Sequence, residues 1–322
     1  MKRIVILAVI LVVIIGGWSA AWIVISGIIR QNVVALADAD GQTTPKLTCA
    51  NLGIGGYPFY FDVTCDGLTV TSGDLTAGVA QVKASVEAYD PWHAVLLATG
   101  PATLADAFTG SRQRLDWQKM EASARLTDWR INRISVIGDA LVLNDTVAGD
   151  ILLGKASHAE FHLLDIPSQH DARKHLAGLA VYAKADDLNA PGFQIADGKS
   201  TLQAEISNLP DDVRTYGDAD IVKRWQTAGG KVTLVDLKGN DGPDNFNVTG
   251  NLALDAENRP AGQLTIGSKG LVERFGSLVP DQWRGLVLGS PATDGSYHQV
   301  LTMTNGLILS GLIPLGTIPP LM

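Results

Sequence analysis

Residues 246–254 read Phe-Asn-Val-Thr-Gly-Asn-Leu-Ala-Leu, and this stretch decides the fold. Apolar side chains recur at nearly every second position, which is the period of a β-strand with one buried face. After a polar turn at residues 257–260, residues 264–266 resume the same alternation. We therefore expect a hairpin. Its apolar side chains should share one face of a sheet: Phe246, Val248, Leu252, Leu254, Leu264 and Ile266.

The period of two returns in many segments before this hairpin. Residues 57–65, 82–88, 122–126, 159–163 and 202–206 all alternate in this way. In the first segment the apolar face consists of Tyr57, Phe59, Phe61, Val63 and Cys65. The chain also has 34 glycines, many at places where hairpins should turn. This pattern predicts a mainly β protein, built on a long antiparallel, meandering sheet that is apolar on one face.

Helices should be few in the sheet region. The candidates are residues 211–227, 168–176 and 271–278, where turn-forming residues bound short apolar patterns. Two or three short helices cannot cover so many strands. The sheet must therefore curve around a groove or close into a sandwich, and the alternation fits both.

The two cysteines, Cys49 and Cys65, lie close together in the sequence. An isolated pair with a short intervening loop predicts a disulfide in an oxidising compartment. A redox pair or a metal site would need a C-x-x-C spacing or further ligands nearby, and the sequence has neither there.

The N-terminus predicts a membrane anchor. Lys2 and Arg3 precede an uncharged apolar run, residues 4–29, and Arg30 follows it. About 20 helical residues suffice to cross a hydrocarbon core. The basic end should stay on the cytoplasmic side, so that the remainder is exported. The alternative is a signal peptide cleaved after Ala37.

The expected organisation is an anchor at 1–31, a linker at 32–47 and a β-rich domain at 48–322. The chain has 25 Lys and Arg against 33 Asp and Glu, a formal charge of −8. Nucleic acid is not an expected partner, because its binding rests on clustered basic residues. Contact with lipid should be apolar, since an acidic exterior does not favour adhesion to anionic headgroups.

His158, Glu160 and His162 are the strongest candidates for chemistry. Residues two apart on a strand point the same way, so these three could present two imidazoles and a carboxylate to a metal. The alternative is an ordinary solvated face, because Ala159 and Phe161 occupy the other side of the strand. The chain has no G-x-S-x-G motif. We expect a protein that is not an enzyme and holds no cofactor.

Two end segments carry a resemblance to a known family. Residues 48–65 read Thr-Cys-Ala-Asn-Leu-Gly-Ile-Gly-Gly-Tyr-Pro-Phe-Tyr-Phe-Asp-Val-Thr-Cys, and residues 305–321 form an apolar, proline-containing ending. Both segments resemble the domain of unknown function 2125 family. That resemblance implies a single-pass protein of the bacterial envelope.

A looser resemblance involves residues 248–255 and 259–266, which are similar to paired strands of the AsmA-like envelope proteins. Those proteins have an N-terminal anchor and a long twisted β-groove, and they are implicated in phospholipid movement or outer-membrane homeostasis. Neither family implies a catalytic residue for this chain.

We therefore expect a bacterial inner-membrane protein with a periplasmic β-domain that binds phospholipid or acyl chains in envelope homeostasis. The expected apolar contacts are Tyr57, Phe59, Phe61, Val63, Phe246, Val248, Leu252, Leu254, Leu264 and Ile266. An envelope scaffold that binds protein partners is the first alternative. A metal-dependent hydrolase using His158, Glu160 and His162 is the second.

Overall fold

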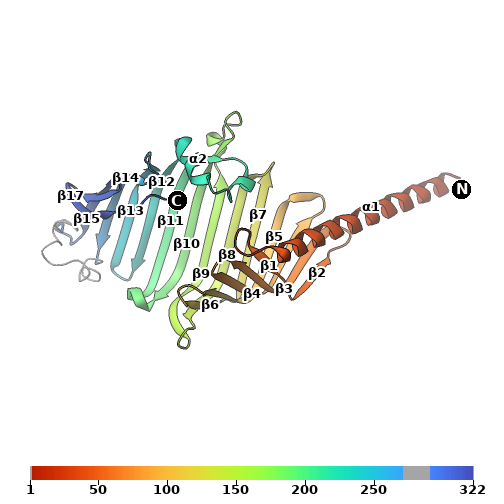
Figure 1. Cartoon of the computed structure of the whole chain (residues 1–322), viewed down its shortest axis with the longest axis horizontal. Helices are drawn as coiled ribbons and strands as arrows, with labels where there is room; N and C mark the ends of the chain where they lie inside the picture. The colour runs from red at the N-terminus through yellow and green to blue at the C-terminus, as the bar shows by residue number, and fades with distance from the viewer. Residues whose placement is uncertain (1, 271–290, 322) are drawn as a thin grey trace. The chain divides into compact units, whose positions relative to one another are not determined.

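The chain folds mainly into antiparallel strands, in a computed structural model that describes residues 2–270 and 291–321 (Figure 1). It divides into two compact units. Unit 1 comprises Met1–Ser123 and Val142–Ile151, and unit 2 comprises Ala124–Leu141 and Leu152–Met322. The predicted fold class is confirmed: one long N-terminal helix is followed by strands joined mostly by hairpin turns.

The N-terminal helix α1 (Lys2–Ala35) is followed by a single 3-10 turn, η1 (Leu36–Asp38). Among the described residues, one helical segment, Lys2–Asp38, is long and apolar enough to cross a membrane. None of the residues of α1 is buried. The predicted anchor at 1–31 lies in this helix, which continues to Ala35.

The sheet of unit 1 grows outward from its edge near α1. Its strands are β1 (Lys46–Thr48), β2 (Asn51–Gly55), β3 (Tyr60–Ser72), β4 (Leu75–Glu87), β5 (Asp90–Asp106) and β6 (Arg112–Asp116). The short strands β1 and β2 pair one after the other with β3, which then pairs with β4. Strand β5 pairs with β4 and β6. The last residues of β8 (Arg130–Asp145) pair with β6.

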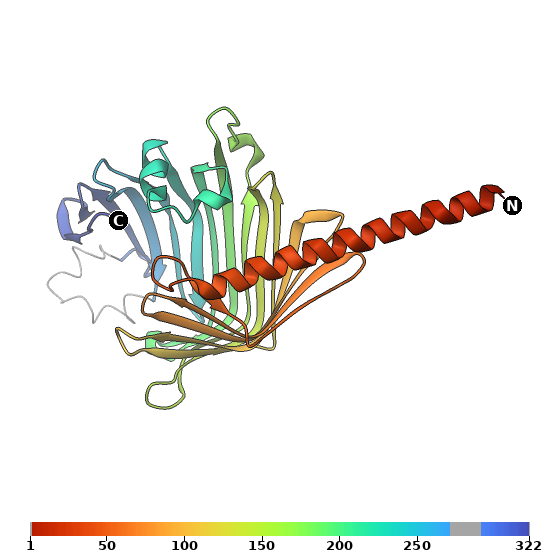
Figure 2. The same cartoon turned by 45° about the vertical axis from the view of Figure 1, so that its right-hand side comes forward.

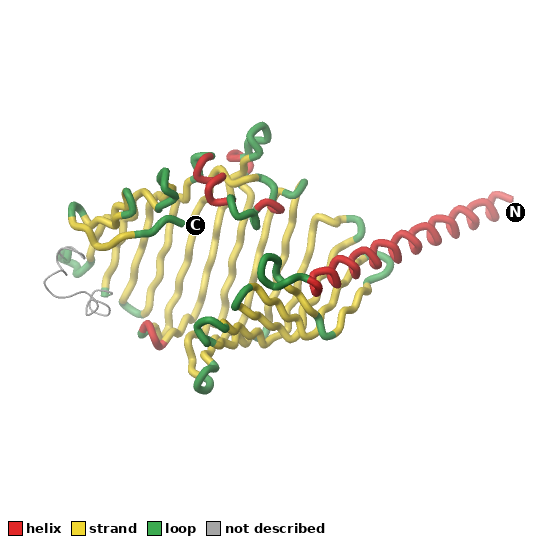
Figure 3. Tube along the Cα trace, viewed as in Figure 1, coloured by secondary structure: helices red, strands yellow, loops and turns green. Residues whose placement is uncertain are grey.

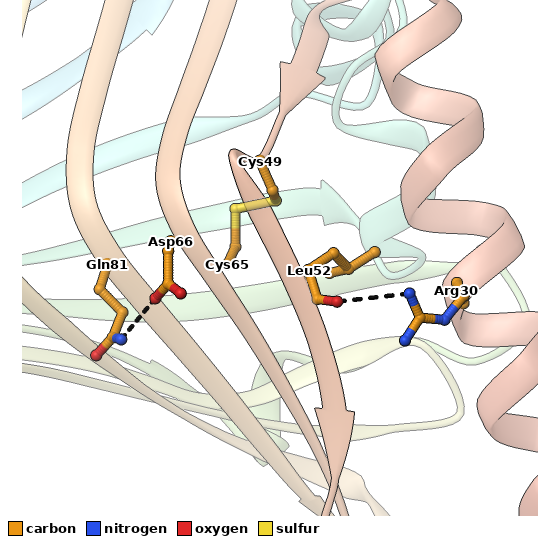
Figure 4. The surroundings of a disulfide bond; sticks show 6 residues. All are labelled: Arg30, Cys49, Leu52, Cys65, Asp66 and Gln81. Carbon is orange, nitrogen blue, oxygen red and sulfur yellow. Dashed lines mark hydrogen bonds between the residues drawn. A yellow bond between two sulfur atoms is a disulfide. The ribbon is translucent and has the colours of Figure 1, made fainter.

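A disulfide ties this edge of unit 1 together. Cys49 lies between β1 and β2, and its bond to Cys65 on β3 spans a Cα–Cα distance of 5.3 Å (Figure 4). On the far side of β2, Arg30 Nη1 donates to the carbonyl oxygen of Leu52 at 3.4 Å. The predicted disulfide is thus confirmed, and it fixes the strand that α1 contacts.

The sheet of unit 2 is a meander (Figure 2). Strands β7 (Lys119–Thr127) and β8 contribute residues to both units. The strands that follow are β9 (Ile151–Asp165), β10 (Leu176–Ala190), β11 (Ile195–Pro210), β12 (Lys231–Asp241), β13 (Asp244–Leu254), β14 (Pro260–Lys269), β15 (Tyr297–Thr304), β16 (Leu307–Ser310) and β17 (Ile313–Thr317). From β9 to β17, each strand pairs antiparallel with the next.

Strand β12 contains a bulge that preserves its apolar face. Leu234 pairs with Gly250 and Leu237 with Val248, so β12 takes three steps where β13 takes two. The register with β11 shifts at the same place. Such an extra residue bends a strand and increases its twist. Here it also returns Leu234 and Leu237 to the same side of the sheet.

The short helices of unit 2 lie at the ends of its strands (Figure 3). They are η2 (Pro167–Gln169), η3 (Pro191–Phe193), η4 (Val213–Thr215) and α2 (Ile221–Thr227). The helix predicted at 211–227 is wrong in extent, because only η4 and α2 form and Gly217 lies between them. The helix predicted at 168–176 is also wrong, since helical structure there ends at Gln169. The one predicted at 271–278 lies outside the described residues.

Little of the described chain is fully buried. The buried apolar residues are Cys65, Ile131, Ala156, Ala177, Leu179, Ala190 and Ala204. No large side chain in the described part has less than 2% of its surface exposed. A closed sandwich packs large side chains between its two sheets. Neither unit, over the described residues, has such an interior.

Candidate functional site: an apolar band across seven strands

The register of unit 2 aligns apolar residues in rows that cross the strands from β9 to β15. The first row, which ends at β14 because Gln299 occupies its position on β15, contains Phe161, Ala183, Leu202, Leu237, Val248 and Ile266. The second contains Leu163, Val181, Ala204, Leu234, Gly250, Leu264 and Leu301. The third, apart from Asp165 on β9, contains Leu179, Ile206, Val232, Leu252, Gly262 and Met303. We call these three rows the apolar band.

The apolar band is only partly covered. Leu179 and Ala204 are buried, with 3% and 7% of their surface exposed, whereas Phe161 has 37% exposed. The other leucine, isoleucine, valine and methionine side chains of the band are half-buried. Strands lie about 4.8 Å apart and same-face residues about 6.7 Å apart, so the band measures about 29 by 13 Å. It is therefore an extended apolar surface.

Two glycines let β13 and β14 approach within the band. Gly250 and Gly262 have φ values of 152° and 148°, which side-chain-bearing residues rarely adopt. A Cβ on Gly250 would collide with the carbonyl oxygen of Gln263, and one on Gly262 with that of Asn251. Because each glycine lies opposite a leucine, Leu264 or Leu252, neither strand interrupts the row at that point.

Phe246 lies beside the band and borders two hollows. Its ring lies against Gly239 on β12, where a Cβ would come within 2.6 Å of Phe246 Cε1. Cavities of about 350 Å³ and about 210 Å³ both include Phe246 and Gly239 in their linings. Lys199 also borders both. Two small hollows thus share the Phe246 ring and Gly239 as part of their walls at this edge of the band.

The ten residues expected to contact lipid fall into three groups. The six from residues 246–266 share one face, as predicted; four of them belong to the band, while Phe246 and Leu254 lie beyond its first and third rows. Phe61 and Val63 share a face of unit 1 with their partners Val86 and Ala84. Tyr57 and Phe59 do not extend this strand, because β3 begins only at Tyr60.

Tyr57 and Phe59 instead form the turn between β2 and β3. Gly56 has a φ of 95°, and Tyr60 N donates to its carbonyl oxygen at 2.8 Å. A Cβ on Gly56 would lie 2.7 Å from Tyr60 O, so the turn requires glycine there. The aromatic residues that follow supply an apparent strand period, which explains why the sequence placed them on a strand. We call residues 56–60 the aromatic turn.

The aromatic turn lies against the middle of α1. Trp18 Nε1 donates to Pro58 O at 2.9 Å, and Trp22 Nε1 donates to Tyr60 O at 3.0 Å. The hydroxyl groups of Ser19 and Tyr57 are 2.8 Å apart. Three helix side chains thus bind this short segment, and they lie on one side of α1 because Trp18 and Ser19 are four and three residues from Trp22.

The three residues proposed as metal ligands have other partners on the polar face of β9. His158 Nδ1 lies 2.7 Å from Asp139 Oδ1, and His162 Nδ1 lies 2.8 Å from Ser135 Oγ. His162 Nε2 is 3.1 Å from Glu160 Oε2. In the described part of the chain, no three His, Cys, Asp or Glu side chains are grouped so that they could hold a metal ion. The arrangement is one of paired hydrogen bonds.

His162, on the polar face of β9, is less exposed than Phe161 on the apolar face. The His162 side chain has 13% of its surface exposed, because its ring stacks on Tyr182 and hydrogen-bonds at both nitrogens. Phe161, on the opposite face, has 37% exposed. Neighbouring polar side chains thus partly cover one another on this face.

An ion pair continues this polar face on β10. Lys184 Nζ lies 2.6 Å from Asp186 Oδ2, and that hydrogen bond holds the pKa of Asp186 below its ordinary value and that of Lys184 above its own. The two faces of the same strands therefore differ sharply in chemistry. Charged and hydrogen-bonded groups occupy one face, and the apolar band occupies the other.

Sequence analysis missed three strands of the band, β10, β12 and β15. In β10 the apolar positions alternate, but alanines on both faces hide the contrast. In β12 the bulge after Leu234 breaks the period of two. The only signal in the sequence was the apolar cluster at residues 232–237, which fits a helix turn as well as a strand.

Comparisons with known proteins identify the family. No curated protein matches the chain, and no solved structure matches it. Residues 22–319 match the family described as "Uncharacterized protein conserved in bacteria (DUF2125)". This match covers most of the chain, from the middle of α1 to the residues after β17. The chain belongs to this family of uncharacterised bacterial proteins.

Proposed function

We propose that this protein is anchored in the bacterial inner membrane by α1 and binds phospholipid acyl chains on the apolar band in the periplasm. One observation carries the proposal: three apolar rows cross the strands from β9 to β15 while most of their large side chains stay half-exposed. Contiguous apolar surface of this extent marks a binding site in a soluble domain. We propose no reaction and no cofactor for it.

The dimensions of the band suit an acyl chain. A hydrocarbon core of about 30 Å holds two acyl chains end to end, so that one chain covers about 15 Å. The band is about 29 Å long by the strand spacing, which leaves room for a chain in any position along it. Each buried methylene contributes about 0.8 kcal/mol, so a chain of ordinary length would be held firmly without any polar contact.

The disulfide and the N-terminal charges support the proposed compartment. Disulfides persist in oxidising environments such as the periplasm. Lys2 and Arg3 before the apolar run favour a cytoplasmic N-terminus, which places the sheet on the other side. The resemblance to AsmA-like groove proteins agrees with this assignment.

Photocrosslinking in living cells tests the proposal on the full chain. A benzophenone amino acid replaces Ile266, in the band, or Thr265, the adjacent residue on the opposite face of β14. We expect adducts with the mass of a phospholipid at Ile266 and none at Thr265. Adducts with protein alone at Ile266 would support the scaffold alternative instead. Equal lipid adducts at both positions would indicate non-specific labelling and contradict the proposal.

A charge introduced into the band provides a second test of the proposal. Leu237→Asp should abolish the lipid adduct at Ile266, because a carboxylate is costly in an apolar contact. Lys238→Asp, next to it on the opposite face, introduces the same side chain and should leave the adduct unchanged. Circular dichroism and thermal melting of both variants establish that they fold alike.

A further inference from the structure

Four aromatic side chains are exposed at one end of the unit 1 sheet. In the aromatic turn, Tyr57, Phe59 and Tyr60 have 52%, 59% and 43% of their surface exposed. Tyr89, in the turn between β4 and β5, has 70% exposed. The two turns are adjacent, because Ala88 N donates to Phe59 O at 2.8 Å. Large aromatic side chains are therefore concentrated where two hairpins end.

The contacts with α1 fix the depth of this end relative to the helix. The uncharged run of α1, residues 4–29, spans about 39 Å at 1.5 Å per residue. A hydrocarbon core of about 30 Å fits within it in several positions, and its far boundary then falls between about residue 23 and residue 29. The aromatic turn meets α1 at Trp18, Ser19 and Trp22. For every such position of the hydrocarbon core along α1, the aromatic turn lies at the far boundary of the core or inside the core.

The hydrogen bonds of the turn suit a medium without water. Backbone carbonyl groups in a hydrocarbon environment need partners from the protein. The carbonyl oxygens of Pro58 and Tyr60 both accept from tryptophan indoles of α1, and Gly56 O accepts from Tyr60 N. Residues 53–61 also contain no charged side chain. Glu87 and Asp90 flank Tyr89. The turn between β4 and β5 therefore belongs at the level of the lipid headgroups.

The rest of unit 1 extends away from this boundary. Beyond the C-terminal end of α1, Gly73 N donates to Gly41 O at 2.7 Å, at the opposite end of β3 from the aromatic turn. Strand β3 thus runs beside the second half of α1. Its 13 residues span about 43 Å.

We propose that Phe59 and its aromatic neighbours insert into the exported-side leaflet of the same bilayer that α1 crosses. The partner is the boundary between phospholipid headgroups and acyl chains, where tyrosine and tryptophan side chains are enriched. The insertion holds one end of the unit 1 sheet at the membrane surface, next to lipid. This inference rests on the proposed membrane anchor, and the apolar band is not needed for it.

Spin labelling of the full chain in vesicles tests the insertion. The labelled variants are Phe59→Cys, Asp74→Cys and Val12→Cys, each purified with the Cys49–Cys65 disulfide oxidised and reconstituted in phosphatidylethanolamine and phosphatidylglycerol. Collision rates with oxygen, which concentrates in lipid, and with a water-soluble nickel chelate report the depth of each label. Asp74 lies in the turn between β3 and β4, at the other end of the strand.

The expected result is that the Phe59 label resembles the Val12 label. Both should collide several-fold less with the nickel chelate than the Asp74 label does. A Phe59 label as accessible to the chelate as the Asp74 label, with Val12 still shielded, would overturn the insertion and leave the anchor standing. A Val12 label in water would overturn the anchor itself.

A second pair of variants at Phe59 shows whether a loss of lipid contact could come from misfolding. Phe59→Trp keeps an interfacial side chain and should shift its emission to shorter wavelength when vesicles are added, relative to the unmodified chain. Phe59→Asp should weaken the contact of the turn with lipid. In a chain that carries both Phe59→Asp and Tyr89→Trp, a quencher attached to the lipid headgroup should then no longer reach the tryptophan at position 89. Unchanged quenching would contradict the proposal.

Discussion

The indole ring of Trp22 stacks on the phenyl ring of Phe61, with centroids 5.7 Å apart and planes inclined by 9°. The same indole meets the ring of Tyr57 edge-on at 5.6 Å and donates to Tyr60 O. One side chain of α1 thus contacts both the aromatic turn and the apolar face of β3. It links the helix to the sheet of unit 1.

Replacing Trp22 should loosen this link. Aromatic pairs contribute about 0.5–1.5 kcal/mol each and a hydrogen bond about 1 kcal/mol, so losing two pairs and one hydrogen bond in Trp22→Ala should destabilise the docked helix by about 2–4 kcal/mol. Trp22→Phe keeps the stacking and loses only the hydrogen bond, and it should cost about 1 kcal/mol. Limited proteolysis in detergent micelles measures the effect as faster cleavage near Tyr57. Equal protection in all three proteins would contradict the docking.

Alanine at Gly250 or Gly262 should destabilise unit 2. Both glycines have strongly positive φ values, and an added Cβ would strike a backbone carbonyl group of the paired strand. Strain of this kind costs about 1–3 kcal/mol, before the loss of neighbouring strand pairing. Gly154→Ala on β9 is the matched control, because its Cβ would come no closer than 3.5 Å to Asn189 O. Chemical denaturation should separate the variants, and equal midpoints would argue against the paired geometry.

Low pH should destabilise three turns that are held by aspartate side chains. The carboxylates of Asp40, Asp106 and Asp294 accept hydroxyl hydrogen bonds from Thr43, Thr109 and Ser296, and these bonds hold the three pKa values below the ordinary 3.8. A lowered folded pKa means that the contribution to stability is present above pH 3.8 and disappears as the pH falls through the lowered value.

The variants Asp106→Asn and Asp294→Asn isolate this effect. Asparagine can still accept the hydrogen bonds but does not titrate, so the loss of melting temperature between pH 5 and pH 2.5 should be smaller in the double variant. Asp38→Asn, at a carboxylate outside these turns, serves as the control. An unchanged slope in the double variant would exclude these carboxylates as a source of acid sensitivity.

Loss of the disulfide should destabilise the edge of unit 1. The two cysteines are separated by 16 residues, and closing a loop of that size contributes about 3 kcal/mol. Cys49→Ser with Cys65→Ser should lower the melting temperature, and reductant should lower that of the unmodified chain to the same value while leaving the double variant unchanged. A reductant effect on the double variant would point to another cause.

Much of the fold could be predicted from the alternation of side chains. The hairpin at 246–266 appeared as expected because each of its strands keeps a regular period over the residues that form the face. The long N-terminal apolar helix followed from the uncharged run, and the disulfide from the cysteine spacing. These features depend on local pattern, which a single sequence contains.

The extent of the candidate site could not be predicted, because it depends on register between distant residues. The row from Phe161 to Ile266 joins residues more than 100 positions apart. The aromatic turn was mistaken for a strand, since Tyr57 and Phe59 continue the period of β3 by coincidence. The helix predicted at 211–227 does not form as one element. Asp212 caps a single turn by accepting a hydrogen bond from Arg214 N at 2.9 Å, and Gly217 then interrupts the helical segment.

The bulge at Val235 and Asp236 has a consequence for how this family can vary. Because the extra residue restores Leu237 to the apolar side, losing one residue there would leave a straighter strand with the same two faces. Losing one residue elsewhere in β12 would exchange the faces of everything beyond it. Substitutions within the rows need only preserve apolar character. Insertions or deletions within a regular stretch of strand must involve an even number of residues if the side chains are to stay on their faces. The apolar face of β12 therefore depends on the length of the strand more than on the identity of each apolar side chain.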